Sequence, residues 1–94
     1  MFGEEALWYY KRGATLVGLR QDAEAARQLK LALSKEAREW VHGRAHVELG
    51  KIADRTGDRR AAHEEYRVAA QLAKSSNDSI GLAEAKLLLA TPAP

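Results

Sequence analysis

Three histidines are the residues of this chain that could hold a metal ion. His42 and His46 are four residues apart, so on a helix both imidazoles would lie on one face and could bind zinc. The chain has no cysteine, and a third ligand would have to come from His63, Glu48 or another carboxylate. The pair His63-Glu64 does not continue into the His-Glu-x-x-His pattern of zinc proteases. Packed or surface imidazoles are the simpler interpretation, and we expect no metal and no cofactor.

Groups that could carry out catalysis are sparse. The four serines fall on a predicted helix surface or in a capping cluster, and none lies in a strained nucleophile turn. The carboxylates are interleaved with Lys and Arg, which keeps them ionised. No glycine-rich phosphate loop is present, because the glycines within predicted helices occur singly. The sequence therefore predicts that the protein is not an enzyme.

A row of basic side chains could attract an acidic partner. Lys51 and Arg55 are four residues apart, and Arg44 shares their helix face. Glu48 and Asp54 lie among them, so an ordinary solvated helix face is the alternative interpretation. The whole chain carries 15 basic and 13 acidic residues, with a net charge of +2 and a pI of about 9.1. This balance, without a recognisable reading motif, argues against nucleic-acid binding.

Five predicted helices position these side chains, because apolar residues recur at three- and four-residue spacing. The predicted helices cover residues 4–19, 23–38, 41–55, 59–74 and 79–90. We expect Asp22 and Asp58 to cap the second and fourth helices. No glycine or proline separates the second helix from the third. We place that turn near residues 39–41, and the alternative is one continuous helix through Trp40.

The chain contains an internal repeat with an offset of 37 residues. Gly13 recurs as Gly50, and a glycine in mid-helix costs about 1 kcal/mol relative to alanine unless another backbone must come close there. At the same offset, Ala25, Leu29, Ala32 and Leu33 recur as Ala62, Tyr66, Ala69 and Ala70. At an offset of 38, Gly43 and Leu49 recur as Gly81 and Leu87. The fifth helix is therefore expected to begin a third unit.

The order Leu49-Gly50, a Gly57-Asp58 turn, then Ala62, Tyr66 and Ala69 resembles the tetratricopeptide repeat. The first unit has Arg20-Gln21 in place of the Gly-Asp turn, and the offset exceeds the usual 34 residues of the family, as in its extended variety. The resemblance implies an all-α fold: a TPR-like α-solenoid of two helix hairpins plus a fifth terminal helix. The expected single domain covers residues 1–90, with repeats at about 6–42 and 43–80, a half-repeat at 79–90 and a tail at 91–94.

The function that the resemblance implies is protein–protein interaction, alone or as part of a larger regulator. The first helix of each hairpin would line a concave, mildly basic groove that binds a peptide or partner protein, with acidic segments favoured. The groove residues carried over are Leu7, Tyr10, Lys11, Ala14, Arg44, Val47, Lys51, Arg55 and Lys86. The family's carboxylate clamp of Lys, Asn and Arg is not expected, because the chain's one asparagine, Asn77, lies in a predicted turn.

The last helix suggests an alternative function, in which the protein is a self-assembling structural protein. A terminal helix of a solenoid normally has a polar outer face. This helix instead carries the leucines of a candidate oligomer interface, Leu82, Leu87, Leu88 and Leu89. Glu4 and Glu5 occupy the place of a signal peptide's basic region, and no apolar run is long enough to span a membrane. The expected location is therefore the cytoplasm.

Overall fold

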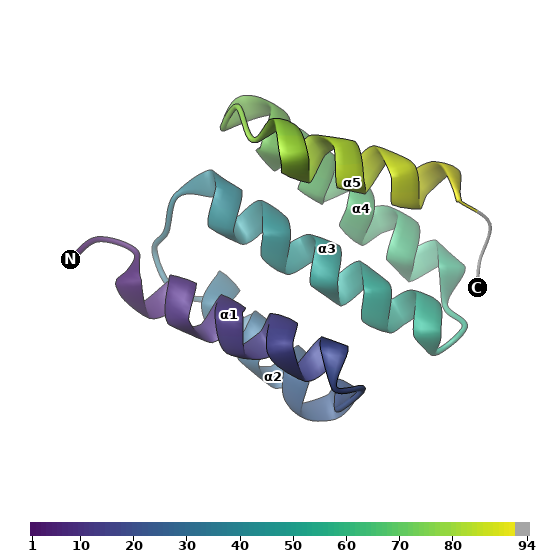
Figure 1. The fold of residues 1–94 in the computed structure, drawn as a ribbon, viewed down its shortest axis with the longest axis horizontal. Coiled ribbons are helices and arrows are strands. Elements are labelled where there is room, and N and C mark those ends of the chain that lie inside the picture. The colour runs from purple at the N-terminus through teal and green to yellow at the C-terminus, as the bar shows by residue number, and fades with distance from the viewer. Residues whose placement is uncertain (92–94) are drawn as a thin grey trace.

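The computed structural model describes residues 1–91, and in this part of the chain all the regular elements are α-helices. The helices are α1 (Glu4–Gly18), α2 (Asp22–Leu33), α3 (Glu39–Arg55), α4 (Arg59–Ser75) and α5 (Ser79–Ala90). The all-α prediction is confirmed. Figure 1 shows α1, α3 and α5 side by side in a front layer, with α2 behind α1 and α4 behind α3 and α5. The predicted tail at 91–94 lies outside the described residues except for Thr91.

Helices α1, α3 and α4 end in the same type of turn, in which one residue has a left-handed backbone conformation. Arg20, Gly57 and Asn77 have φ values of 60°, 87° and 58°. In each turn the next N–H reaches back to a helix carbonyl: Gln21 N to Leu16 O at 2.9 Å, Asp58 N to Ala53 O at 2.9 Å and Asp78 N to Ala73 O at 2.8 Å. This pattern is the Schellman motif, which satisfies the last carbonyls of a helix. Arg20 therefore adopts the backbone conformation of Gly57, and the two hairpin turns are alike despite their different residues.

One of the two predicted helix caps is confirmed. The Asp58 carboxylate accepts a hydrogen bond from Ala61 N at 3.0 Å and caps α4. The predicted cap at Asp22 is wrong, because Asp22 is the first residue of α2 and its neighbour Gln21 is the cap without a side-chain bond. Asp22 binds Arg55 instead. Asp78 caps α5 by accepting from Gly81 N at 3.1 Å.

The join between the second and third helices lies earlier than predicted. α2 ends at Leu33 and α3 begins at Glu39, so both the turn at 39–41 and the continuous helix through Trp40 are wrong. The Ser34 hydroxyl donates to Leu31 O at 2.7 Å, and His42 Nε2 lies 2.9 Å from Lys35 O. Ser34 thus satisfies a carbonyl in the last turn of α2, and His42 satisfies a carbonyl of the loop that follows, so the chain can leave the helix without glycine or proline.

The chain forms two hairpins, α1–α2 and α3–α4. In each hairpin a large side chain of the second helix packs on a glycine of the first helix. A Cβ added to Gly13 would lie 2.6 Å from Leu29 Cγ, and a Cβ added to Gly50 would lie 2.6 Å from Tyr66 Cδ1. Both large residues are fully buried. The two contacts lie 37 residues apart, as the repeat predicted, but the close neighbour is mainly a side chain rather than a backbone.

The third unit follows a different offset from the one predicted. Gly43 packs on Leu72 of α4, whereas Gly81 lies against Asp78, the cap of its own helix. The starts of α3 and α5 are 40 residues apart. At that offset the buried residues Val41 and Ala45 of α3 correspond to the buried Gly81 and Ala85 of α5. The helix starts and these two buried pairs therefore relate α3 to α5 by 40 residues, while at the predicted offset of 38 the buried Gly43 and Val47 also correspond to the buried Gly81 and Ala85.

Candidate functional site

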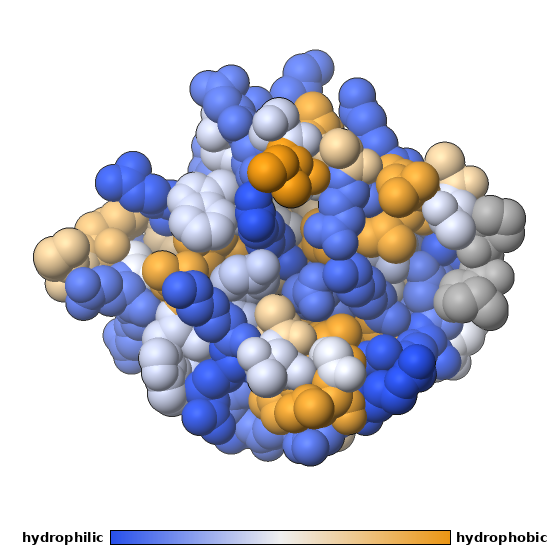
Figure 2. Space-filling view, in the orientation of Figure 1, coloured by the Kyte–Doolittle hydropathy of each residue, from blue (hydrophilic) through white to orange (hydrophobic). Residues whose placement is uncertain are grey.

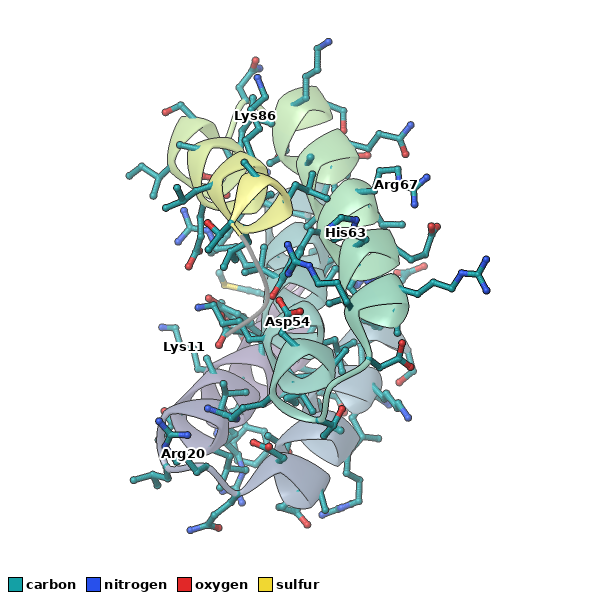
Figure 3. All side chains as sticks on the ribbon, turned by 90° about the vertical axis from the view of Figure 1, so that its right-hand side faces the viewer. Lys11, Arg20, Asp54, His63, Arg67 and Lys86 are labelled. Carbon is teal, nitrogen blue, oxygen red and sulfur yellow. The ribbon has the colours of Figure 1, made fainter. Side chains whose placement is uncertain are left out.

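A cleft of about 430 Å³ opens where the C-terminal ends of α1, α3 and α5 meet the start of α4. Apolar side chains and several cations share its wall. The lining residues are Val17, Arg20, Lys51, Asp54, Arg55, Arg59, Tyr66, Leu88 and Thr91. Figure 3 views this end of the molecule and places Asp54 near its centre. Of the predicted groove residues, Lys51 and Arg55 lie in this cleft.

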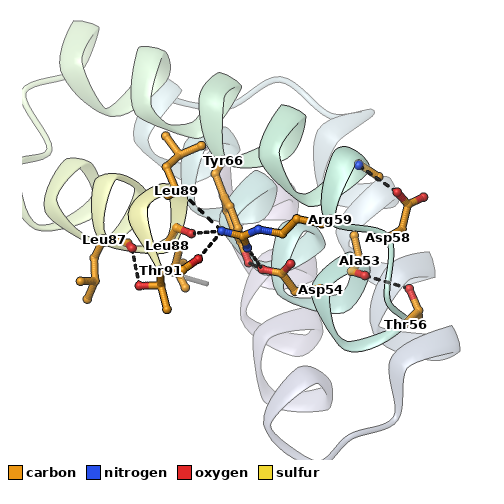
Figure 4. Close-up of polar contacts among 11 residues, drawn as sticks. Ala53, Asp54, Thr56, Asp58, Arg59, Tyr66, Leu87, Leu88, Leu89 and Thr91 are labelled. Carbon is orange, nitrogen blue, oxygen red and sulfur yellow. Dashed lines mark hydrogen bonds and ion pairs between the residues drawn. The ribbon is translucent and has the colours of Figure 1, made fainter. Parts of the chain in front are cut away.

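Arg59, Asp54 and Tyr66 form a buried polar network in the cleft wall (Figure 4). Arg59 Nη1 lies 2.6 Å from Asp54 Oδ2, and the Tyr66 hydroxyl donates to the same oxygen at 2.7 Å. Arg59 Nη2 also donates to Leu88 O at 2.9 Å and to the Thr91 carbonyl. The Arg59 side chain therefore connects α3 to the C-terminal end of α5, where the helix dipole favours a cation.

The network controls the protonation of its members. Burial acts to raise the pKa of Asp54, but the hydrogen bonds from Arg59 and Tyr66 outweigh burial and hold that pKa below its usual value. Burial, together with the hydrogen bond to Asp54, raises the pKa of Tyr66 well above its usual value. The carboxylate is thus ionised and the phenol neutral over the physiological range.

Lys51 connects α3 to α5 through two carboxylates. Its Nζ lies 2.9 Å from Glu48 Oε2 and 3.0 Å from Glu84 Oε2. Burial alone would lower the pKa of Lys51, but its bonds to the two glutamates raise it. Lys51 therefore faces the cleft as a cation that is already neutralised by two neighbours.

Arg55 and Arg44 make similar connections at the two ends of α3. Arg55 Nη2 donates to Asp22 Oδ1 at 2.6 Å and to Val17 O at 2.9 Å, which holds α3 against the turn between α1 and α2. Arg44 binds Asp78 with two bonds of 2.9 Å and lies over the Trp40 ring at 5.4 Å. Two-pronged contacts of this kind are strong and orient both partners. Arg44, Lys51 and Arg55 are therefore all paired within the chain.

The other predicted groove residues lie in varied surroundings. Leu7, Tyr10 and Ala14 of α1 are half-buried. Val47 is 2% exposed and packs with Ala69 and Ala85, so it belongs to the core and cannot contact a partner. Lys11 and Lys86 are exposed and form no ion pair with any residue in the described range 1–91.

Four exposed cations on the side of the front layer form no ion pair within residues 1–91. They are Lys11, Arg12, Arg20 and Lys86, and the Arg12 guanidinium lies over the Trp8 ring. In Figure 3, Lys11, Arg20 and Lys86 lie on the side of α1 and α5, whereas Arg67 extends from α4 on the opposite side. The positive charge available to a partner therefore comes from these unpaired cations rather than from the predicted row on α3.

The leucines of the predicted oligomer interface do not share one face. Leu88 packs against the cluster of Val47, Ala69 and Ala85, and Leu82 and Leu89 are half-buried. Leu87 is 66% exposed and is the one that extends fully outward.

The histidines each have a different polar neighbour. His42 Nε2 contacts Lys35 O, and His46 Nδ1 lies 2.7 Å from Glu65 Oε1. No group of three His, Asp or Glu side chains in residues 1–91 is arranged to hold a metal ion.

Several residues of the cleft were not predicted from the sequence. Arg20 could have been found from its position opposite Gly57 in the repeat, which places it in the turn at the cleft rim. Arg59, Tyr66 and Leu88 carried no such signal, because only packing brings α4 and α5 to the end of α3. A second hollow of about 360 Å³ on α1, which contains Trp8, Lys11 and Leu16, was also not predicted.

Acid should destabilise the protein through Asp78 as well as Asp54. The hydrogen bonds from Arg44 hold the pKa of Asp78 below its usual value of 3.8. The unfolded chain then binds protons at a higher pH than the folded chain, so the free energy of unfolding falls as the pH drops below 3.8. We expect urea midpoints to show a smaller loss on acidification in Asp78→Asn and in Arg44→Gln than in the wild type. Equal losses in all three proteins would contradict this assignment.

No helix in residues 1–91 combines the length and the apolar character needed to cross a bilayer. In comparisons with known proteins, no protein-family model, no curated protein and no solved structure matches this chain.

Proposed function

We propose that this protein is a TPR-like α-solenoid that serves as a protein-interaction module and not as an enzyme. The sequence resemblance to the tetratricopeptide repeat is one support. The second is that both hairpins use the same turn conformation and the same contact of a glycine with a large buried residue, 37 residues apart. Repeated units of this kind stack on their neighbours and leave the first helices of the hairpins on one side.

The binding surface that we propose is the front layer around the cleft. Its volume of about 430 Å³ falls within the range of roughly 300–1,000 Å³ that is typical of ligand pockets. Val17 and Leu88 provide apolar wall, and Arg20 lies at the rim without an ion pair in the described part of the chain. This combination suits an extended peptide that inserts one apolar side chain and places a carboxylate near Arg20. The position of Arg20, which has no ion pair within residues 1–91, beside the apolar wall of the cleft is the observation that carries the proposal.

Peptide selection followed by charge reversal tests this function. Peptides selected by phage display on the immobilised chain should be enriched in an apolar residue with Asp or Glu nearby. Fluorescence anisotropy with the selected peptide should give a Kd at least about tenfold higher for Arg20→Glu, because attraction is replaced by repulsion. Arg67→Glu makes the same charge change on the opposite side of the molecule and should leave the Kd within about twofold.

Two results would overturn the groove assignment. One is an equal Kd for the wild type and Arg20→Glu. The other is an Arg67→Glu effect as large as that of Arg20→Glu, which would show that net charge rather than the cleft governs binding.

A further inference from the structure

The helices of each hairpin pair by placing small residues opposite large ones. Gly13 lies against Leu29, and Gly50 lies against Tyr66. The second helices carry the complementary order, in which a small residue precedes the large one by four positions and another follows it by three. In α2 these residues are Ala25, Leu29 and Ala32, and all are fully buried. The alternation lets two antiparallel helices approach closely while large side chains fill the spaces over small ones.

α5 carries the same alternation on a face that no described residue covers. Ile80, Ala83, Leu87 and Ala90 follow one another at spacings of three, four and three, so they form one stripe along the helix. All four are exposed, and the exposed fractions of Ile80 and Leu87 are 72% and 66%. Figure 2 shows individual apolar side chains, separated by hydrophilic ones, over the upper part of the molecule, where α5 lies in Figure 1. We call these four residues the α5 stripe.

On α3 the equivalent stripe is covered. At the offset of 40 residues, Ala83 and Leu87 correspond to Gly43 and Val47. Gly43 packs on Leu72 of α4, and Val47 is 2% exposed. The α5 stripe therefore corresponds to the face with which α3 packs on α4. Within residues 1–91 no second helix packs on that face of α5.

We propose that α5 of a second copy of this chain covers the α5 stripe. The two helices run antiparallel about a two-fold axis that passes midway between Ala83 and Leu87. Ile80 then lies opposite Ala90 of the second copy, and Ala83 lies opposite Leu87 of the second copy. Symmetry repeats both contacts, so each of the four positions places a large residue against a small one.

The order of residues in the stripe favours a second copy over another occupant. From Ile80 to Ala90 the stripe reads large, small, large, small. An antiparallel second copy presents the same residues in the reverse order, so each large residue lies opposite a small one. A two-fold interface requires a surface of this kind. The pairing uses a different face from the cleft and does not depend on the proposed peptide binding.

Charges at the edges of the stripe give the interface a distinct salt dependence. Glu84 on one edge lies 3.0 Å from the Lys51 ammonium, which it shares with Glu48. Lys86 on the other edge is exposed, and the two-fold axis places the Lys86 side chains of both copies on the same edge. Added salt screens their repulsion, so self-association should strengthen with ionic strength. Binding of an acidic peptide at Arg20 should weaken instead, which separates the two proposals.

Sedimentation equilibrium tests the interface. One short helix per copy buries less than the roughly 800 Å² per partner of a stable complex, so we expect a dimer with a Kd in the micromolar range. Leu87→Glu should remain helical and monomeric at concentrations where the wild type dimerises. Leu19→Glu is the matched control, because Leu19 is 61% exposed but lies at the end of α1, and this variant should dimerise as the wild type does. A monomeric wild type throughout, or equal loss in both variants, would overturn the proposal.

Cysteine cross-linking tests the antiparallel order, and the chain has no cysteine of its own to interfere. Residues 80 and 90 are about 15 Å apart along one helix, too far for a disulfide within a copy. Under oxidation, Ile80→Cys/Ala90→Cys should form a covalent dimer, because the thiol introduced at position 80 of each copy meets the thiol introduced at position 90 of the other. The single variants Ile80→Cys and Ala90→Cys should stay monomeric on a non-reducing gel. Cross-linking of either single variant would indicate a parallel pair and contradict the two-fold arrangement.

Discussion

Arg59→Met should lower the free energy of unfolding by about 3–5 kcal/mol, because it leaves a buried carboxylate without its cation. The Asp54 side chain is 7% exposed, and without Arg59 its Oδ2 would keep only the Tyr66 hydroxyl. The change also removes the donor to the Leu88 and Thr91 carbonyls at the end of α5. A chain of this length has a total stability as low as about 5 kcal/mol. Urea denaturation followed by circular dichroism would measure the loss.

Two further variants separate the charge effect from lost packing. Arg60→Met changes an exposed neighbour that has no ion pair within residues 1–91, so its free energy of unfolding should stay within about 0.5 kcal/mol of wild type. Asp54→Leu/Arg59→Met removes both charges and should recover a large part of the loss. If the double variant is as unstable as the sum of the two single changes, the ion pair is not the cause.

Gly50→Ala should lower the free energy of unfolding by about 1–3 kcal/mol, even though alanine favours helices by about 1 kcal/mol over glycine. The new Cβ would lie 2.6 Å from Cδ1 and 2.9 Å from Cζ of Tyr66. The ring is fully buried and its hydroxyl is held by Asp54, so it cannot move aside without disturbing the network. Thermal and urea unfolding would both report the change.

Gly18→Ala is the matched control for Gly50→Ala. Gly18 is the last residue of α1, and a Cβ added there meets nothing within 4 Å. This variant should therefore gain up to about 1 kcal/mol of stability from helix propensity alone. The sign of the effect should differ between the two glycines. A similar gain at both positions would mean that Gly50 is not in close contact with Tyr66 in solution.

The helices and their pairing were largely predictable from the sequence because these features depend on local patterns. Apolar spacing located all five helices, and the starts and ends of the last two agree with the prediction to within one residue. The repeat of Gly13 and Leu29 as Gly50 and Tyr66 marked the contacts that close both hairpins. The error at the end of α2 arose because Ser34 satisfies a carbonyl of its last turn and His42 satisfies a carbonyl of the following loop, and neither role can be predicted from the residue type.

Only the tertiary structure decided which charges remain available and which leucine faces outward. Arg44 and Arg55 find carboxylates 34 and 33 residues away, and such partners depend on how neighbouring units stack rather than on spacing along one helix. The same stacking partly buries Leu88 and leaves Leu87 exposed, because α5 is covered from one side by α3 and α4. The sequence by itself thus determined a repeated helical hairpin. Packing between units then neutralised the predicted basic row and left Arg20 and the α5 stripe at the surface.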